Sequence, residues 1–167
     1  ENEGWTYAKY LLSFERSNSY APSLRRALRK VRDMAKKEQA EGRAVLDDID
    51  FRRKVDALKI DISAIEYTEL RINSVMAAGQ QPGPESSMLK CHGTELQQAI
   101  SELAVEAIGA WALPFVQNPW ERTNVPRPGP DYAAPVTPYY FNLRKASIYA
   151  GSNEIQRNIM AKLVLGL

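Results

Sequence analysis

Apolar side chains recur every three or four residues through the middle of the chain, and this spacing predicts long amphipathic helices. Between Asp50 and Gly79 the recurring positions are Phe51, Val55, Leu58, Ile62, Ile65, Ile72 and Met76. An α-helix has 3.6 residues per turn, so side chains at this spacing share one face, and that face must be buried against other elements. Gly79 is expected to end this helix.

The same period continues on both sides of this helix. Pro82-Gly83-Pro84 is expected to form a turn, and Ser86 to cap a second long helix that closes at Gly109. The predicted apolar face of that helix is Leu89, Leu96, Ile100, Leu103 and Ala107. The first segment is expected to be helical from Trp5 to about Lys37, with a kink or restart at Pro22, because proline lacks a backbone N–H.

Two shorter helices are expected at the C-terminal end of the chain. They lie around Phe141–Tyr149 and Asn153–Leu165, and no segment has the pattern of a strand. Residues 111–138 form a proline-rich insert, which either packs over the bundle or reaches a partner subunit. The fold class is therefore all-α: residues 1–167 form one up-and-down bundle of four main helices plus a short C-terminal helix.

Charge and cysteine content exclude several classes of protein. A formal net charge of +2 gives no general reason to bind nucleic acid. No apolar run approaches membrane-spanning length, the charged start Glu1-Asn2-Glu3 does not resemble a signal peptide, and Cys91 is the single cysteine. We therefore expect a protein that is not secreted and that suits a reducing compartment.

Two local clusters invite other interpretations. The basic stripe on the first helical segment is read as a solvated face or as a contact to a cofactor phosphate; it consists of Arg25, Arg29, Arg32 and Lys36. Cys91, His92 and Glu95 have the spacing of helical metal ligands. A di-iron bundle needs paired Glu-x-x-His motifs, and this chain has one histidine, so no metal site is predicted.

The last part of the chain holds a long and specific run, from Ile148 to Lys162. The chain is expected to turn at Gly151, and Ser152 or Asn153 to cap a new helix that begins with Glu154. The unpaired backbone N–H groups at the start of such a helix attract the anionic part of a ligand.

This run resembles the C-terminal signature of the acyl-CoA dehydrogenases, flavoproteins that desaturate acyl-CoA thioesters. The resemblance extends from Gly4-Trp5 to the last residue. Family members carry an N-terminal helical domain and a middle β-domain before this region, so the resemblance implies a C-terminal domain. It also implies FAD, an acyl-CoA substrate, an electron-transfer flavoprotein as electron acceptor, and dimers or tetramers of one or two kinds of chain. The domain alone is not expected to bind FAD or to be active.

The resemblance also assigns the catalytic base. Many members place a glutamate just before the signature glycine, where this chain has Ala150. Another branch places it on the first helix of the domain, immediately before an arginine, which matches Glu15 and Arg16. Glu15 shares a predicted helical face with apolar residues, and partial burial raises the pKa of a carboxylate toward that of a useful base. The alternative is an ordinary surface pair of Glu15 and Arg16.

Other site residues follow from the same resemblance. Arg16 matches an acyl-CoA contact, or else pairs with a neighbouring acid. Ala150 and Gly151 match positions that meet the substrate, since glycine permits close approach of the backbone. Ser152, Asn153 and Glu154 match positions that touch the flavin nucleotide, or else only cap the helix.

Two departures from the family concern the flavin site. The family's Arg-x-x-Phe-Gly stretch is absent, and Arg43 alone remains there as a phosphate contact. Its glutamine followed by Gly-Gly is replaced by residues 106–110, which place the carboxylate of Glu106 where an amide is usual. These changes suit a divergent branch or one subunit of a mixed assembly. The alternative to an enzyme is a non-catalytic helical assembly subunit or interaction module.

Overall fold

The computed structural model describes residues 2–15, 19–116, 118, 121 and 124–167, and for residues 9 and 12–15 it describes the backbone. Six α-helices follow one another: α1 Gly4–Glu15, α2 Ala21–Lys37, α3 Ile49–Ala77, α4 Glu85–Ile108, α5 Val136–Leu143 and α6 Asn153–Met160. Short 3-10 turns cover Val45–Asp47, Gly109–Ala112 and Arg144–Ser147, and a π-helical turn covers Ala161–Leu165.

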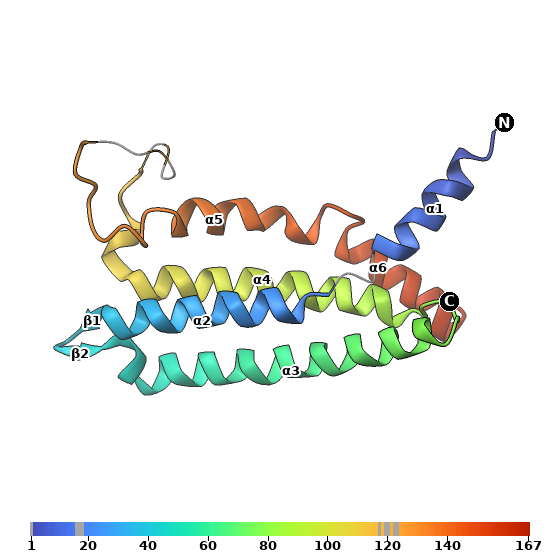
Figure 1. The fold of residues 1–167 in the computed structure, drawn as a ribbon, viewed down its shortest axis with the longest axis horizontal. Helices are drawn as coiled ribbons and strands as arrows, with labels where there is room; N and C mark the ends of the chain where they lie inside the picture. The colour runs from blue at the N-terminus through green and yellow to red at the C-terminus, as the bar shows by residue number, and fades with distance from the viewer. Residues whose placement is uncertain (1, 16–18, 117, 119–120, 122–123) are drawn as a thin grey trace.

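Four of the helices lie side by side as an antiparallel bundle (Figure 1). α2, α3, α4 and α5 alternate in direction; α6 packs against α4 at one end, and α1 points away from the bundle. The prediction of an all-α bundle with four main helices and a short C-terminal helix is therefore confirmed.

The core lies between α2, α3 and α4, and the apolar periodicity predicted most of it. Every residue of the predicted α3 face is buried except Met76, which is partly buried, and the whole predicted α4 face is buried. From α2 the buried side chains are Ala21, Leu24, Leu28, Val31 and Ala35. The predicted restart at Pro22 is also confirmed, because Pro22 lies in the first turn of α2, where no N–H is needed.

The N-terminus of α2 is capped from another helix. Glu69 of α3 is buried, and its carboxylate accepts hydrogen bonds from the N–H groups of Tyr20 and Ala21, the latter at 3.1 Å. The hydroxyl of Ser19 donates to the same carboxylate at 2.8 Å. A negative charge at a helix N-terminus is favourable, so Glu69 ties the start of α2 to the middle of α3.

Three local predictions were wrong. Residues Gln39–Ala40 (β1) and Arg43–Ala44 (β2) pair as a short antiparallel hairpin, turned by Glu41 and Gly42 at positive φ. Ser86 does not cap α4, which begins at Glu85; the Ser86 hydroxyl donates to the carbonyl of Gly83 instead. α5 begins at Val136, earlier than expected, because Pro138 lies in its first turn, where proline is tolerated.

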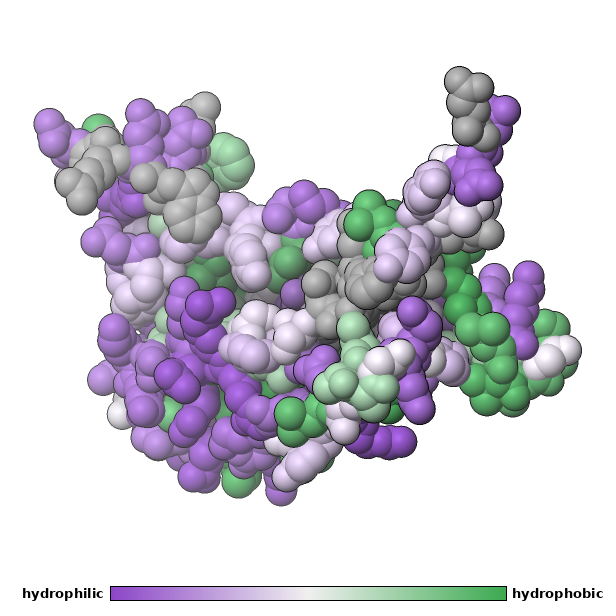
Figure 2. Space-filling view, turned by 45° about the vertical axis from the view of Figure 1, so that its right-hand side comes forward, coloured by the Kyte–Doolittle hydropathy of each residue, from purple (hydrophilic) through white to green (hydrophobic). Residues whose placement is uncertain are grey.

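Apolar side chains are exposed at the end of the molecule that lies away from the hairpin (Figure 2). They belong to the α5–α6 turn, α6 and the π-helical turn: Ile148, Tyr149, Ile155, Leu163, Val164 and Leu165. α1 exposes a second group, which includes Trp5, Tyr7 and Tyr10. Within the described part of the chain, no helix combines the length and the apolar character that a membrane span requires.

Candidate functional site

The turn between α5 and α6 has an uncommon backbone. Ala150 and Gly151 both have positive φ, at 55° and 84°. A side chain at position 151 would be strained by this φ, and its Cβ would lie 2.6 Å from Nε2 of Gln156. Ala150 adopts the left-handed region at a cost of roughly 1 kcal/mol. Strained backbone of this kind is often found at functional sites, which fits the predicted substrate-contacting role of this turn.

α6 begins with a capped N-terminus. The Ser152 side chain accepts a hydrogen bond from the N–H of Ile155, at the long distance of 3.5 Å. A hydrogen bond to the Ser152 side chain is the main reason that the pKa of the exposed Glu154 carboxyl is lowered, so Glu154 is ionised at neutral pH. Its negative charge offsets part of the positive potential of the helix N-terminus. The turn therefore suits a neutral acceptor, such as a carbonyl or hydroxyl oxygen, better than a phosphate.

The Asn153 side chain points into the bundle and binds α4. Its Oδ1 accepts hydrogen bonds from Nζ of Lys90 at 2.9 Å and from Oγ1 of Thr94 at 3.3 Å. The thiol of Cys91 donates to the Asn153 carbonyl at 3.6 Å. Lys90 and Asn153 are both buried, and burial lowers the pKa of Lys90. Of the three residues predicted to touch a nucleotide, Asn153 is thus occupied in anchoring α6.

Sequence reasoning missed this anchor, although a signal for it was present. Lys90 and Thr94 are four residues apart on α4, so they share a helical face, and that face is the one that packs on α6. A lysine beside the core residue Leu89 needs a buried partner. What the sequence could not identify was the partner, which lies 63 residues further along the chain.

The cysteine and its neighbour Glu95 on α4 are both bound by α6. Cys91 donates to the Asn153 carbonyl, and Glu95 accepts from the Asn153 side chain at 3.4 Å and from Arg157, with Nη2 and Oε1 2.6 Å apart. Nδ1 of His92 is 3.7 Å from the other carboxylate oxygen of Glu95. Among the described residues, no group of three His, Cys, Asp or Glu side chains could hold a metal ion.

The predicted base lies at the end of α1. Glu15 is the last residue of that helix, and the structure describes its backbone; Arg16 lies outside the described residues. Tyr20, the residue before α2, is close to Tyr149, the residue before Ala150. Burial is the main reason that the pKa of Tyr20 is raised, and the nearby Tyr149 phenol adds to it. The start of α2 and the α5–α6 turn therefore lie at the same end of the bundle (Figure 1).

A pocket lies where the two segments that depart from the family pattern, those of Arg43 and of Glu106, come together. This hairpin pocket, of about 510 Å³, lies between the β1–β2 hairpin and the C-terminal end of α4, and Arg43, Glu106 and Gly109 all line it. Glu106 is bound by Lys54 of α3, whose Nζ lies 2.7 and 2.8 Å from the two carboxylate oxygens.

The charges of the hairpin pocket are mostly negative. Its lining acids are Glu38, Glu41, Asp48 and Glu106. Arg43 is the one cation among its described lining residues. The pKa of Asp48 is lowered mainly because its carboxylate accepts a hydrogen bond from the N–H of Phe51, so this acid is ionised. Lys54 pairs with Glu106, and the other three carboxylates face Arg43 alone, so the pocket keeps a negative charge that does not fit the pyrophosphate of a dinucleotide.

The chain is similar to a known protein family over almost its whole length. The family model described as "Acyl-CoA dehydrogenase, C-terminal domain" matches residues 2–165. The acyl-CoA dehydrogenase IpdE1 of Mycobacterium tuberculosis is 29% identical over 99% of this chain, and the chain spans 38% of that protein's length.

Solved structures have the same fold at lower identity. The ChsE4-ChsE5 complex of Mycobacterium tuberculosis contains a chain with a TM-score of 0.75 and 24% identity, covering 100% of this chain and 42% of that one. Butyryl-CoA dehydrogenase of Megasphaera elsdenii has a TM-score of 0.76 and 17% identity, covering 99% and 39%. At these identities the likeness shows the fold alone.

Proposed function

Because the chain belongs to the acyl-CoA dehydrogenase family and matches the C-terminal domain of its members, we propose that it is part of an enzyme. This enzyme introduces an α,β double bond into an acyl-CoA thioester. The observation that carries this proposal is the α5–α6 turn: two consecutive left-handed residues at 150 and 151, followed by a capped helix that Lys90 anchors to α4. Such a turn presents backbone at close range while side chains stay out of the way.

Each residue of the site has a distinct task in this proposal. Glu15 removes the proton next to the thioester carbonyl, a reaction that a partly desolvated carboxylate performs near neutral pH. Arg16 helps to hold the acyl-CoA. Ala150 leaves the alternative base position empty, and Gly151 lets the backbone approach the thioester. FAD, when bound in the whole enzyme, supplies the acceptor for the hydride that leaves the neighbouring carbon.

The flavin nucleotide is proposed to contact the α5–α6 turn. Ser152 offers a hydroxyl and the first turn of α6 offers backbone N–H groups, which suit the oxygen atoms of the ribityl chain or of the flavin ring. Asn153 and Glu154 contribute through their backbone, because the side chain of Asn153 is held by Lys90.

We propose further that the enzyme is an oligomer in which this chain pairs with a different subunit. The exposed apolar side chains at the α6 end are those of a surface that another chain covers. The hairpin pocket argues against a symmetric assembly with flavin at every interface, because its carboxylates repel a pyrophosphate. A dimer or tetramer of identical chains is the alternative. An electron-transfer flavoprotein is the proposed electron acceptor, and a bacterial cytoplasm or a mitochondrial matrix the proposed location.

Reduction of bound flavin by acyl-CoA tests the proposed activity. The whole protein, expressed with its partner subunit where one exists, should be yellow, and anaerobic addition of a suitable acyl-CoA should bleach the flavin absorbance. A panel of straight, branched and polycyclic acyl-CoA thioesters covers the substrate class. If the purified assembly binds FAD but none of these thioesters bleaches it, the alternative of a non-catalytic assembly subunit is favoured.

The hairpin pocket gives a separate prediction about FAD. In the whole assembly, Arg43→Gln and Glu106→Gln should each change the affinity for FAD by less than about threefold, because the pocket is proposed not to hold the nucleotide. Fluorescence titration of the apo assembly with FAD measures this affinity. A loss of tenfold or more in Arg43→Gln would place FAD in the pocket and make Arg43 a phosphate contact.

A further inference from the structure

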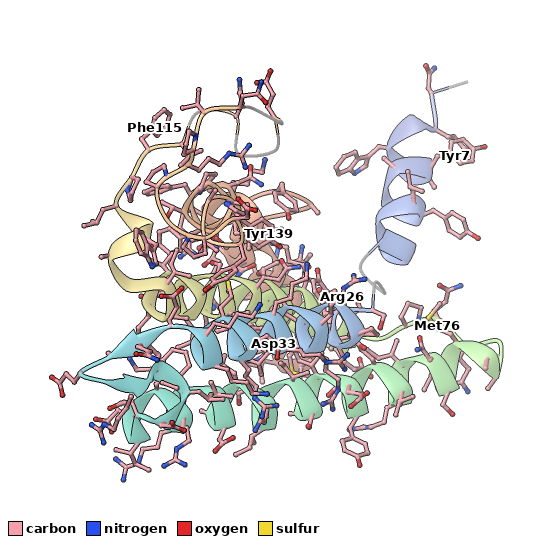
Figure 3. All side chains as sticks on the ribbon, turned by 60° about the vertical axis from the view of Figure 1, so that its left-hand side comes forward. Tyr7, Arg26, Asp33, Met76, Phe115 and Tyr139 are labelled. Atoms are coloured by element: carbon pink, nitrogen blue, oxygen red, sulfur yellow. The ribbon has the colours of Figure 1, made fainter. Side chains whose placement is uncertain are left out.

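A groove of about 690 Å³ runs between α2, α4 and α5 and shares no lining residue with the hairpin pocket. α2 forms one wall, α4 the floor, and α5 with the residues before it the other wall (Figure 3). Arg26 and Asp33 of α2 face this region from one side, and Tyr139 of α5 lies on the other.

The floor of the groove is apolar. It consists of side chains that are buried or partly buried in the bundle: Leu24, Ala27, Val31, Ile100, Ala104 and Val136. Tyr132 and Tyr139 add aromatic surface above this floor. The phenol of Tyr132 donates to Glu38 at 2.6 Å, which together with burial raises its pKa to about 12.

Cations line the α2 edge of the groove. Arg26, Lys30 and Lys37 are exposed and lie on the groove side of α2. Among the described residues, no carboxylate lies within ion-pair distance of Arg26, Lys30 or Lys37. Nζ of Lys37 lies 5.1 Å from the centre of the Tyr132 ring, which holds this ammonium at the groove. Asp33 is the one acid of the lining, and its carboxylate lies 4.0 Å from Nζ of Lys36.

Some cations outside the groove, in contrast, are paired with carboxylates. Arg25 on the opposite side of α2 binds Glu66 of α3, and Lys54 binds Glu106. Along α2, the acid Asp33 is greatly outnumbered by basic residues, which are Arg25, Arg26, Arg29, Lys30, Arg32, Lys36 and Lys37. The groove thus combines an apolar floor with an excess of positive charge, since Arg26, Lys30 and Lys37 line it with Asp33 as the one acid of the described lining.

We propose that this groove binds an amphipathic anion: a molecule with one extended apolar body and a single carboxylate or phosphate head group. The apolar body lies on the Val31–Ile100 floor, and Arg26 and Lys30 bind the head group. A volume of about 690 Å³ lies within the range of small-molecule sites.

Isothermal titration of the chain with dodecanoate tests the proposal without any flavin, so its outcome is independent of the proposed dehydrogenase activity. Dodecanoate should bind at one site, and 1-dodecanol should bind at least about tenfold more weakly, because it lacks the charge that the two cations meet. Butanoate should bind at least about a hundredfold more weakly than dodecanoate, since each buried CH₂ contributes roughly fourfold in affinity. Dodecyl phosphate should bind like dodecanoate if the head-group site accepts either anion.

A matched pair of variants locates the site. Arg26→Gln/Lys30→Gln removes two groove cations and should weaken dodecanoate at least about tenfold. Arg29→Gln/Arg32→Gln removes the same charge from the same helix outside the groove and should leave the affinity within about twofold. All four positions are exposed or half-exposed, so circular dichroism should show both variants folded. Equal losses in the two variants, equal binding of 1-dodecanol, or no binding of dodecanoate would each overturn the proposal.

Discussion

Glu15→Gln should slow the reduction of flavin by acyl-CoA at least about a hundredfold in the whole enzyme, the low end for loss of a general base. Glutamine keeps the size and hydrogen-bonding capacity of the side chain, so flavin and acyl-CoA should still bind. Stopped-flow absorbance under anaerobic conditions separates binding from reduction. Wild-type reduction rates in this variant would end the assignment of Glu15, and the base would then lie elsewhere in the enzyme.

A second carboxylate position gives this experiment its control. Position 150 is where many family members place the base, and here it holds Ala150 in a left-handed conformation. Ala150→Glu in the Glu15→Gln background should restore part of the activity, because the C-terminal end of α1, where Glu15 lies, and the α5–α6 turn are at the same end of the bundle (Figure 1). Ala150→Gln in the same background keeps the size without the base and should restore nothing.

Glu69→Ala should destabilise the folded chain by about 2–3 kcal/mol. The substitution removes the acceptor that the N–H groups of Tyr20 and Ala21 share, and leaves these donors without a partner in a buried setting. Glu66→Ala, three residues earlier on the same helix, removes an exposed ion pair with Arg25 and should cost less than about 1 kcal/mol.

Urea denaturation followed by circular dichroism measures both variants. Glu69→Gln should fall between them, since its amide oxygen still accepts while the charge at the helix N-terminus is lost. A Glu69→Ala variant no less stable than Glu66→Ala would mean that α2 needs no cap from α3.

Local periodicity predicted the bundle well because the residues of one buried helical face lie only three or four positions apart in the sequence. Phe51, Val55 and Ile62 repeat at helical spacing whatever their partners are, and all three are buried. The exact residue at which a helix begins was harder to predict. Ser86 has the chemistry of a cap and lies in the right place, yet Pro84 and Glu85 already begin the helix and the Ser86 hydroxyl turns back to Gly83.

In the candidate site, too, features that depend on adjacent residues were predicted and contacts between distant residues were not. Gly151 and Ser152 were correctly expected to form a turn and a cap, since both roles depend on adjacent residues. The orientation of Asn153 depends on Lys90, far away in the sequence, and no local pattern reveals it. The hairpin at Gln39–Ala44 was missed because its strands have two residues each, too few for an alternation of apolar and polar side chains.

The central place of α4 has a consequence for the order of folding. α4 packs against α2, α3, α5 and α6, so four of the other helices depend on it for a partner. During synthesis α2 and α3 are made before α4, and as a pair they can bury only the seam between them. Their remaining apolar faces stay open to solvent until the chain has been made as far as Ile108. Release from a chaperone, or resistance to a protease added during translation, should therefore coincide with the completion of α4.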